Sequence, residues 1–209
     1  PILVGGSGLY VRAVLDKIEF PGTDSAIRKR LEAQAAQLGI EKMHQRLAEV
    51  DPQSAARIVP ANERRVIRAL EVYELTGRKF SATMPRREYF QPALQLGISW
   101  PLPVLDERIS QRTSQMLAQG FIAEVEELQK LGLADTPTAC RATGYQAVMD
   151  LLAGKLTRDE AAEQIALQTR QLARKQRKWF RKDPRIHWLD GKAGASANLE
   201  QALTLLGIK

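Results

Sequence analysis

The chain has 209 residues, of which 44% are hydrophobic, which is enough for one sizeable core or two small ones. No stretch approaches the roughly 18 uninterrupted apolar residues of a membrane span. The first residues do not show the pattern of a secretory signal, and the single cysteine, Cys140, excludes an internal disulfide. We therefore expect a cytoplasmic protein that does not enter a membrane.

The formal net charge is +7, and one segment carries it. Residues 164–182 hold seven of the 31 Lys and Arg residues and no Asp or Glu, so the remaining 24 bases equal the 24 acids. A local patch of this kind attracts a polyanion better than the same charge spread evenly. The plain alternative is a solvated helix face.

The apolar run at residues 1–4 stops at Gly5 and Gly6 and leads into a stretch that favours helix. An apolar strand that ends in glycines and opens a helix is typical of a central strand in a parallel sheet. Because a central strand needs neighbours on both sides and the sequence offers none upstream, we expect a truncated chain.

Helix signals dominate the rest of the sequence. Gly39 predicts a helix stop, Asn62 predicts an N-cap, and Thr157 followed by Glu160 is a capping-box signature. The expected helices cover residues 25–38, 41–50, 54–58, 62–76, 106–131 with Gly120 as a candidate break, 144–152 and 157–182.

Two more segments, 94–100 and 186–189, favour strands. The sequence therefore predicts an α/β fold that is mostly helical, in which three parallel-type strands are interrupted by a helical block. The expected division is a core segment at 1–23, a helical insertion at 24–87 that ends in a basic link (78–87), and the remainder of the core at 88–209.

The first candidate site is the glycine-rich turn that contains Ser7. Glycines after a strand let backbone amides approach a ligand closely, and a helix N-terminus favours an anion. Ser7 adds a hydroxyl for a phosphate oxygen or a base edge. A plain strand-to-helix turn is equally consistent with these residues, and the pattern of a nucleotide-binding P-loop is absent from them.

A second candidate is the predicted helix after Asn62. Arg64, Arg65 and Arg68 suit a phosphate backbone, because guanidinium groups bind oxyanions bidentately. The opposite side is apolar and contains Val66 and Ile67. The alternative is pairing within the helix, since Glu71 follows Arg68 by three residues.

Two further candidates lie downstream. Arg108 and Arg112 share a helix face, where a surface ion-pair ladder is the plain alternative. A polar loop then offers a cation, a hydroxyl and a ring on which a base could stack. This loop consists of Arg141, Ala142, Thr143, Gly144, Tyr145 and Gln146.

The basic helix carries the strongest signal. Arg170, Arg174, Arg177 and Arg181 recur at helical spacing on one side, with no acid in the segment to neutralise them. Such a stripe predicts a ligand with several negative charges, such as RNA or pyrophosphate. Binding to a membrane surface is the main rival, but the apolar face is modest.

No metal site is expected within these residues. His44 and His187 each lack a second ligand at metal spacing, and both are expected to be structural or exposed. Cys140 has no histidine near it in sequence and is expected to pack as a small hydrophobic residue.

Five stretches together resemble the tRNA dimethylallyltransferase (isopentenyltransferase) family. They lie in the same order as in the family and cover nearly the whole chain, which makes the set far more specific than any one member. The stretches are PILVGGSGLY (1–10), DPQSAARIVPANERRVIRALEVYELTG (51–77), MLAQGFIAEVEEL (116–128), RATGYQ (141–146) and TRQLARKQRKWFR (169–181).

The resemblance implies a P-loop-kinase-like core with a helical insertion domain. It also implies transfer of a dimethylallyl group from dimethylallyl diphosphate to the exocyclic amine of the adenosine 3′ of the tRNA anticodon, with the base flipped out of its stack. The expected partners are the tRNA anticodon stem-loop, the diphosphate and Mg²⁺, and the expected state is a monomer.

The same resemblance suggests roles for individual residues. Ser7 lies where the family usually has a threonine at the reaction channel, which makes it the catalytic candidate. Arg112 and Arg170 are candidates for diphosphate contacts. The candidates for tRNA contacts are Arg28, Arg64, Arg65, Val66, Ile67, Arg68 and the six residues of the 141–146 loop.

One departure from the family pattern is large. The family's P-loop and the following aspartate, the expected general base, do not occur in this sequence. We therefore expect this chain alone not to turn over. Two alternatives stay open: an RNA-binding module without chemistry, and an adenylate isopentenyltransferase that acts on free nucleotides.

Overall fold

The computed structural model describes residues 1–83 and 87–208, which form two compact units. The first unit consists of Pro1–Leu3 and Leu9–Ala93, and the second consists of Val4–Gly8 and Leu94–Lys209. Residues 84–86 of the predicted basic link lie outside the described part. No helix in the described part is long and apolar enough to cross a membrane.

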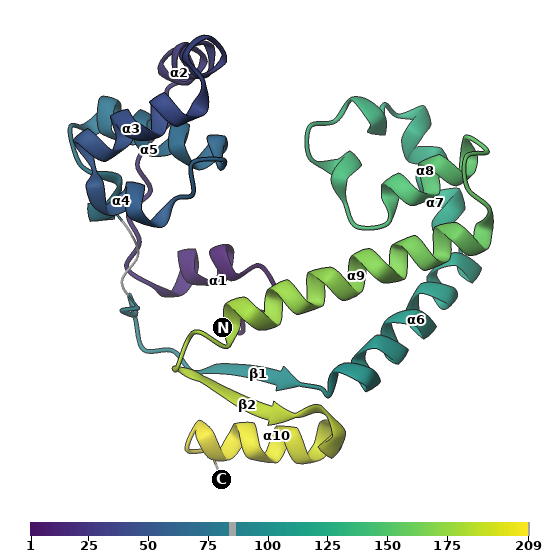
Figure 1. Cartoon of the computed structure of the whole chain (residues 1–209). Helices are drawn as coiled ribbons and strands as arrows, with labels where there is room; N and C mark the ends of the chain where they lie inside the picture. The colour runs from purple at the N-terminus through teal and green to yellow at the C-terminus, as the bar shows by residue number, and fades with distance from the viewer. Residues whose placement is uncertain (84–86, 209) are drawn as a thin grey trace. The chain divides into compact units, whose positions relative to one another are not determined.

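The first unit is helical (Figure 1). Several helix ends follow the predicted signals: Asn62 caps the helix Glu63–Thr76 through its side chain, Gly77 ends the same helix with φ of 66°, and Gly39 ends another with φ of 85°. The helix predicted at 54–58 instead covers Pro52–Arg57. The elements are α1 (Gly8–Leu15), α2 (Ser25–Leu38), α3 (Ile40–Val50), α4 (Pro52–Arg57), α5 (Glu63–Thr76) and the 3₁₀ turn η1 (Phe80–Thr83).

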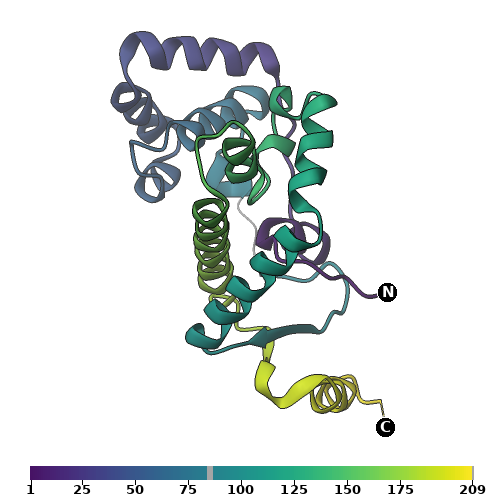
Figure 2. The ribbon, with the colours of Figure 1, turned by 90° about the vertical axis from the view of Figure 1, so that its right-hand side faces the viewer.

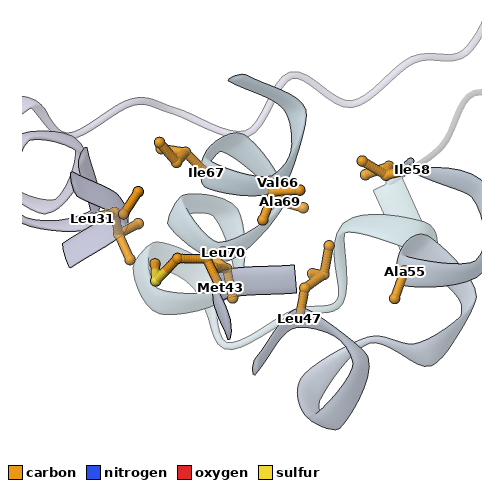
Figure 3. Packing of buried hydrophobic residues seen from close by; sticks show 10 residues of the cluster. Leu31, Met43, Leu47, Ala55, Ile58, Val66, Ile67, Ala69 and Leu70 are labelled. Carbon is orange, nitrogen blue, oxygen red and sulfur yellow. The ribbon is translucent and has the colours of Figure 1, made fainter. Parts of the chain in front are cut away.

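The core of this unit is formed where α2, α3 and α5 meet (Figure 3). Leu31, Met43, Leu47 and Leu70 are at most 1% exposed, and Val66 is completely buried. Each comes from the apolar side of its helix, so the three helices close one hydrophobic cluster. This cluster fixes the direction in which the polar faces of the helices point.

The predicted strand at residues 1–4 does not form. These residues have no regular structure, and Ile2 and Val4 are 94% and 87% exposed. A strand is held by hydrogen bonds to a neighbour, and in the described part of the chain the only sheet consists of two other strands. The prediction of three strands was therefore wrong for this structure.

The second unit contains that sheet. Strands β1 (Gln95–Ser99) and β2 (Ile186–Asp190) pair in parallel, with Gln95 opposite Ile186 and Ser99 opposite Asp190. Both strands and their parallel relation were predicted. A parallel pair needs a long crossover, and here it consists of α6 (Leu102–Ala118), α7 (Phe121–Lys130), η2 (Leu133–Asp135), η3 (Ala139–Arg141), α8 (Tyr145–Leu152) and α9 (Arg158–Phe180).

The longest helix, α9, starts at the predicted capping box of Thr157 and Glu160. The predicted break at Gly120 is confirmed, since this residue has φ of 106° between α6 and α7. In two views at right angles α6 and α9 run beside each other (Figures 1 and 2). After β2 come η4 (Gly191–Ala193) and α10 (Gly194–Leu205), a helix that the sequence signals did not identify.

Candidate nucleic-acid interface

The glycine-rich loop at residues 4–8 packs against α9 within the second unit. A Cβ atom at Gly6 would overlap the side chain of Gln176, and one at Gly8 would overlap the indole of Trp179. Close approach to the rigid indole thus requires glycine at Gly8, whereas a Cβ at Gly6 would meet only the movable end of Gln176 and a Cβ at Gly5 would meet nothing. Ser7 lies between the two contacts and is exposed. The loop therefore holds the Ser7 hydroxyl beside the basic helix.

Three arginines of the α9 stripe have partners on α6 or at Trp100, just before it, although Arg174 remains exposed. Arg174 donates to both carboxylate oxygens of Asp106, over 2.6 and 3.1 Å. Arg170 donates to the hydroxyl of Ser110 over 3.3 Å, and Arg177 donates to the carbonyl of Trp100 over 3.5 Å. The expectation that no acid neutralises the stripe was wrong, because the acid comes from a helix distant in sequence.

The two diphosphate candidates lie on this helix pair but differ in setting. Arg112 is exposed on α6, whereas Arg170 is partly buried beside Ser110. Arg108, one turn before Arg112, does not form the predicted ladder; its guanidinium lies over the Trp100 ring, 4.5 Å from the centroid.

A pocket of about 360 Å³ opens where β1 and β2 end. Arg177 supplies a cation, and Trp100 and Trp188 supply aromatic surface. The remaining lining residues are Ser99, Pro101, Leu189 and Asp190. Ligands of parallel sheets bind at the carboxyl ends of the strands, so this pocket suits an anionic or aromatic group. The sequence analysis missed it, although the ends of the two predicted strands could have indicated it.

The polar loop at 141–146 divides into exposed and engaged residues. Arg141, Ala142, Thr143 and Gln146 are exposed, whereas Gly144 is buried with φ of 95°. Tyr145 donates its hydroxyl to Glu124 over 2.7 Å, and its ring centroid lies 5.7 Å from that of Phe121.

The hydrogen bond to Glu124 raises the pKa of Tyr145. Because its hydroxyl and ring already have partners, Tyr145 is a supporting residue in this structure. From this loop the cation Arg141 and the hydroxyl of Thr143 are the groups that remain open to a ligand.

In the first unit, two of the predicted RNA-binding arginines hold a buried carboxylate. Glu71 is completely buried and accepts from Arg28 over 2.6 Å, from Arg68 over 2.9 Å and from the amide of Asp24 over 3.1 Å. Burial raises the pKa of Glu71, but these hydrogen bonds outweigh it and hold the pKa below its ordinary value. Arg68 also donates to the carbonyls of Pro21 and Gly22.

The remaining candidates on α5 are either buried in the core or exposed to solvent. The side chains of Val66 and Ile67 lie in the core, so they cannot reach an RNA. Arg64 and Arg65 are exposed. The surface of α5 that can meet a phosphate backbone is therefore narrower than the sequence suggested.

His44 and Cys140 have structural roles and His187 is exposed, as expected. Nε2 of His44 lies 3.1 Å from the carbonyl oxygen of Ala55 and 2.8 Å from that of Ile58. Cys140 packs against the hydrophobic cluster of the second unit. The described residues contain no group of three or more His, Cys, Asp or Glu side chains that could hold a metal ion, so these residues do not by themselves fit Mg²⁺.

Comparison with known proteins identifies the family. The model of the IPP transferase family matches residues 1–183. The chain belongs to the IPP transferase family. It is 52% identical over 195 residues to the tRNA dimethylallyltransferase of Kineococcus radiotolerans, covering 93% of this chain and 62% of that protein. It is 56% identical over 189 residues to the enzyme of that name from Pseudarthrobacter chlorophenolicus, covering 90% and 62%.

Solved structures agree with the fold. The tRNA isopentenylpyrophosphate transferase of Bacillus halodurans matches with a TM-score of 0.60 and 31% identity, over 96% of this chain and 63% of that one. A eukaryotic dimethylallyltransferase acting on tRNA matches with a TM-score of 0.80 over 100% of this chain and 57% of that one; at 24% identity this likeness concerns the fold. The chain thus spans about 60% of the length of the relatives that it matches.

Proposed function

We propose that the complete protein transfers the dimethylallyl group of dimethylallyl diphosphate to the exocyclic amine of the adenosine 3′ of the anticodon in tRNA. The observation that carries the proposal is the loop at residues 4–8, which holds the exposed Ser7 while Gly6 and Gly8 pack against α9. Family membership and the names of the relatives support it.

The chemistry suits this arrangement. The amine nitrogen attacks the first carbon of the dimethylallyl group, the carbon–oxygen bond to the diphosphate breaks, and the amine proton passes to a base. The leaving diphosphate takes the electron pair and needs cations where its charge develops. We assign the diphosphate to Arg112 and Arg170, and we assign to Ser7 a hydrogen bond to a phosphate oxygen or to the base. By the resemblance, the base is an aspartate in a segment whose pattern does not occur within residues 1–209.

The RNA is held by the exposed candidates of both units. Arg64 and Arg65 bind phosphates, and Arg141 and Thr143 contact the anticodon region. Arg28 and Arg68 contribute to RNA binding indirectly, through their hydrogen bonds to Glu71. A magnesium ion that accompanies the diphosphate, a monomeric state and a cytoplasmic location belong to the same proposal.

The proposal is tested with a chimera that joins to this chain the part of the Kineococcus relative that lies outside the match. We expect it to add a dimethylallyl group to an anticodon stem-loop, measured by mass spectrometry. Ser7→Ala should lower the rate of transfer by about 100-fold, the effect of removing one hydrogen-bonding group from a reacting site. Ser7→Thr, which keeps the hydroxyl, is the matched control.

Other outcomes separate the alternatives. Modification of free AMP and not of the stem-loop would identify an adenylate isopentenyltransferase. Tight RNA binding without transfer to either acceptor would identify a non-catalytic RNA-binding module.

A further inference from the structure

The exposed part of the polar loop, residues 141–143, is fixed where it begins. The hydroxyl of Thr136 accepts from the amide of Cys140 over 3.0 Å, and the thiol of Cys140 donates to the carbonyl of Thr136 over 2.8 Å. The amide of Arg141 donates to the carbonyl of Thr138 over 3.0 Å. The turn η3 therefore leads into the loop from a fixed point.

The loop is also fixed where it ends, at Gly144 and Tyr145. A Cβ atom at Gly144 would lie 3.2 Å from the Phe121 ring and 3.4 Å from Cγ2 of Ile165, so this turn packs directly on the hydrophobic cluster of the second unit. The rings of Phe121 and Tyr145 are tilted by 47° to each other. These apolar contacts hold one end of the tyrosine ring, but they do not fix the direction of its hydroxyl.

Glu124 on α7 fixes that direction. Its carboxylate accepts from the Tyr145 hydroxyl over 2.7 Å, and this hydrogen bond is exposed to water. An exposed polar contact adds little to the stability of a fold, because water offers the same groups equivalent partners. Its main effect is on the freedom of the loop, since a ring tied to α7 cannot turn away from the helix.

We infer that Glu124 is a positioning residue for RNA: through the hydroxyl of Tyr145 it holds the loop whose exposed groups meet the anticodon region. The inference rests on the proposed function, which assigns that contact to Arg141 and Thr143. A loop that is ordered before binding loses less conformational entropy when its ligand arrives. Glu124 therefore increases the affinity for RNA without contacting the RNA itself.

The charge of Glu124 separates a positioning role from a passive one. A carboxylate near a surface that binds phosphates repels the RNA, so removal of a passive carboxylate should tighten binding slightly. Removal of a positioning carboxylate should weaken binding, because the released loop has to be ordered again when RNA binds. The two roles thus predict changes of opposite sign.

The test uses variants of the 209-residue chain. Glu124→Ala removes the acceptor, and Tyr145→Phe removes the donor but keeps the ring. Glu124→Gln removes the charge but keeps an oxygen that can accept from the hydroxyl. The matched control is Glu126→Ala, which removes the same charge from an exposed position on another side of α7. Circular dichroism and thermal unfolding check that each variant is folded.

Binding to an anticodon stem-loop is measured by fluorescence anisotropy at about 100 mM KCl, where phosphate contacts still contribute strongly. We expect Glu124→Ala and Tyr145→Phe each to bind about tenfold more weakly, which corresponds to the ordering of one released residue. The double variant should bind no more weakly than either single variant, because both changes remove one shared hydrogen bond. Glu124→Gln should bind within about twofold of wild type, and Glu126→Ala should bind as wild type or slightly more tightly.

A kinetic measurement in the chimera separates positioning from chemistry. We expect Glu124→Ala to raise the KM for the stem-loop about tenfold and to leave kcat unchanged, because the loop acts on binding and not on the reacting atoms. The KM for dimethylallyl diphosphate should also stay unchanged. A general loss of folded protein would lower kcat instead.

Three results would overturn the inference and leave the proposed function standing. The first is binding by Glu124→Ala that equals or exceeds that of wild type. The second is a loss in Glu124→Ala that Tyr145→Phe does not share, since Glu124 would then contact the RNA directly. The third is a double variant in which the two losses add. If Glu124→Ala does not fold, Tyr145→Phe alone decides, and wild-type binding by it overturns the inference.

Two further results concern the proposed function. Absence of wild-type binding to the stem-loop would overturn both the inference and the proposed function. Failure of transfer by the chimera, with the effects of Glu124→Ala and Tyr145→Phe on binding present, would count against the proposed chemistry alone.

Discussion

The two units use their arginines in the same way but in different surroundings. In the first unit Arg28 and Arg68 converge on Glu71, which is completely buried. In the second unit Arg174 meets Asp106 at an exposed site, where the two side chains are 45% and 29% exposed. A run of arginines in sequence therefore does not identify a ligand surface by itself, because guanidinium groups also bind carboxylates of the same protein. Because the ion pairs of Glu71 are more buried than the pair of Arg174 with Asp106, we expect the two sites to contribute different amounts to the free energy of unfolding.

The largest effect is expected at Glu71. Glu71→Gln removes the charge that holds Arg28 and Arg68, and we expect a loss of about 3 kcal/mol in the free energy of unfolding of the first unit. This is the low end of the range for breaking a buried ion pair, because both arginines reach solvent. Urea unfolding followed by circular dichroism measures it. Glu63→Gln, at the exposed start of the same helix, is the control, and a loss equal to that control would contradict the comparison.

The same carboxylate predicts a pH dependence. The pKa of Glu71 lies below its ordinary value of 4.5, so the ionised form is favoured by folding. Its contribution is present in full above the ordinary value and is lost as pH falls through the lower pKa of the folded state. We expect the stability difference between wild type and Glu71→Gln to be constant from pH 8 to about 5 and to shrink below about 4.

Asp51 titrates in the same acidic range. Burial raises its pKa, but hydrogen bonds from Ser54 and Ser81 outweigh this and lower it. Since Asp51 is present in both proteins, its contribution cancels in the difference. A difference that does not change with pH would show that the Glu71 charge has no role in the stability of the fold.

The next effect concerns the loop in the second unit. Gly8→Ala would place a methyl group inside the Trp179 indole, and we expect a loss of about 1–3 kcal/mol, as for overpacking. Gly8 is the first residue of α1, where alanine by itself would stabilise the helix. A loss of stability would therefore indicate that the overlap with the indole outweighs this gain. Thermal unfolding with tryptophan fluorescence measures it. Gly5→Ala is the matched control, and Trp179→Leu should relieve part of the loss if contact with the indole is its cause.

Features that depend on local sequence were predicted more fully than side-chain contacts between distant residues. The capping box at Thr157, the break at Gly120 and the positions of the two strands follow from signals within a few residues. The contact of Arg68 with Glu71 was foreseen because it joins residues three apart on one helix. The strand at residues 1–4 failed because a strand exists only with a neighbour.

The candidate site shows the same limit. The bond of Arg174 to Asp106 joins residues 68 apart, so no pattern within α9 could indicate that its arginine side is occupied. Which side of α9 stays exposed depends on where α6 and the loop at residues 4–8 pack around it, and the sequence of the helix itself does not give these positions.

The smallest effect on stability is expected at Asp106. Asp106→Asn removes an exposed carboxylate, so its loss should leave the unfolding midpoint almost unchanged, in contrast to Glu71→Gln. It also leaves Arg174 without a neutralising charge, and we expect the salt slope of binding to an anticodon stem-loop to rise by about 0.7–0.9, the contribution of one added phosphate contact. Glu107→Gln is the control for net charge, because Glu107 is the next residue of the same helix and its carboxylate binds Gln111 and not Arg174. If Asp106→Asn lowered stability as much as Glu71→Gln, the exposed pair would matter to the fold as much as the buried one. If it left the salt slope unchanged, the arginine side of α9 would be closed to RNA even without its acid.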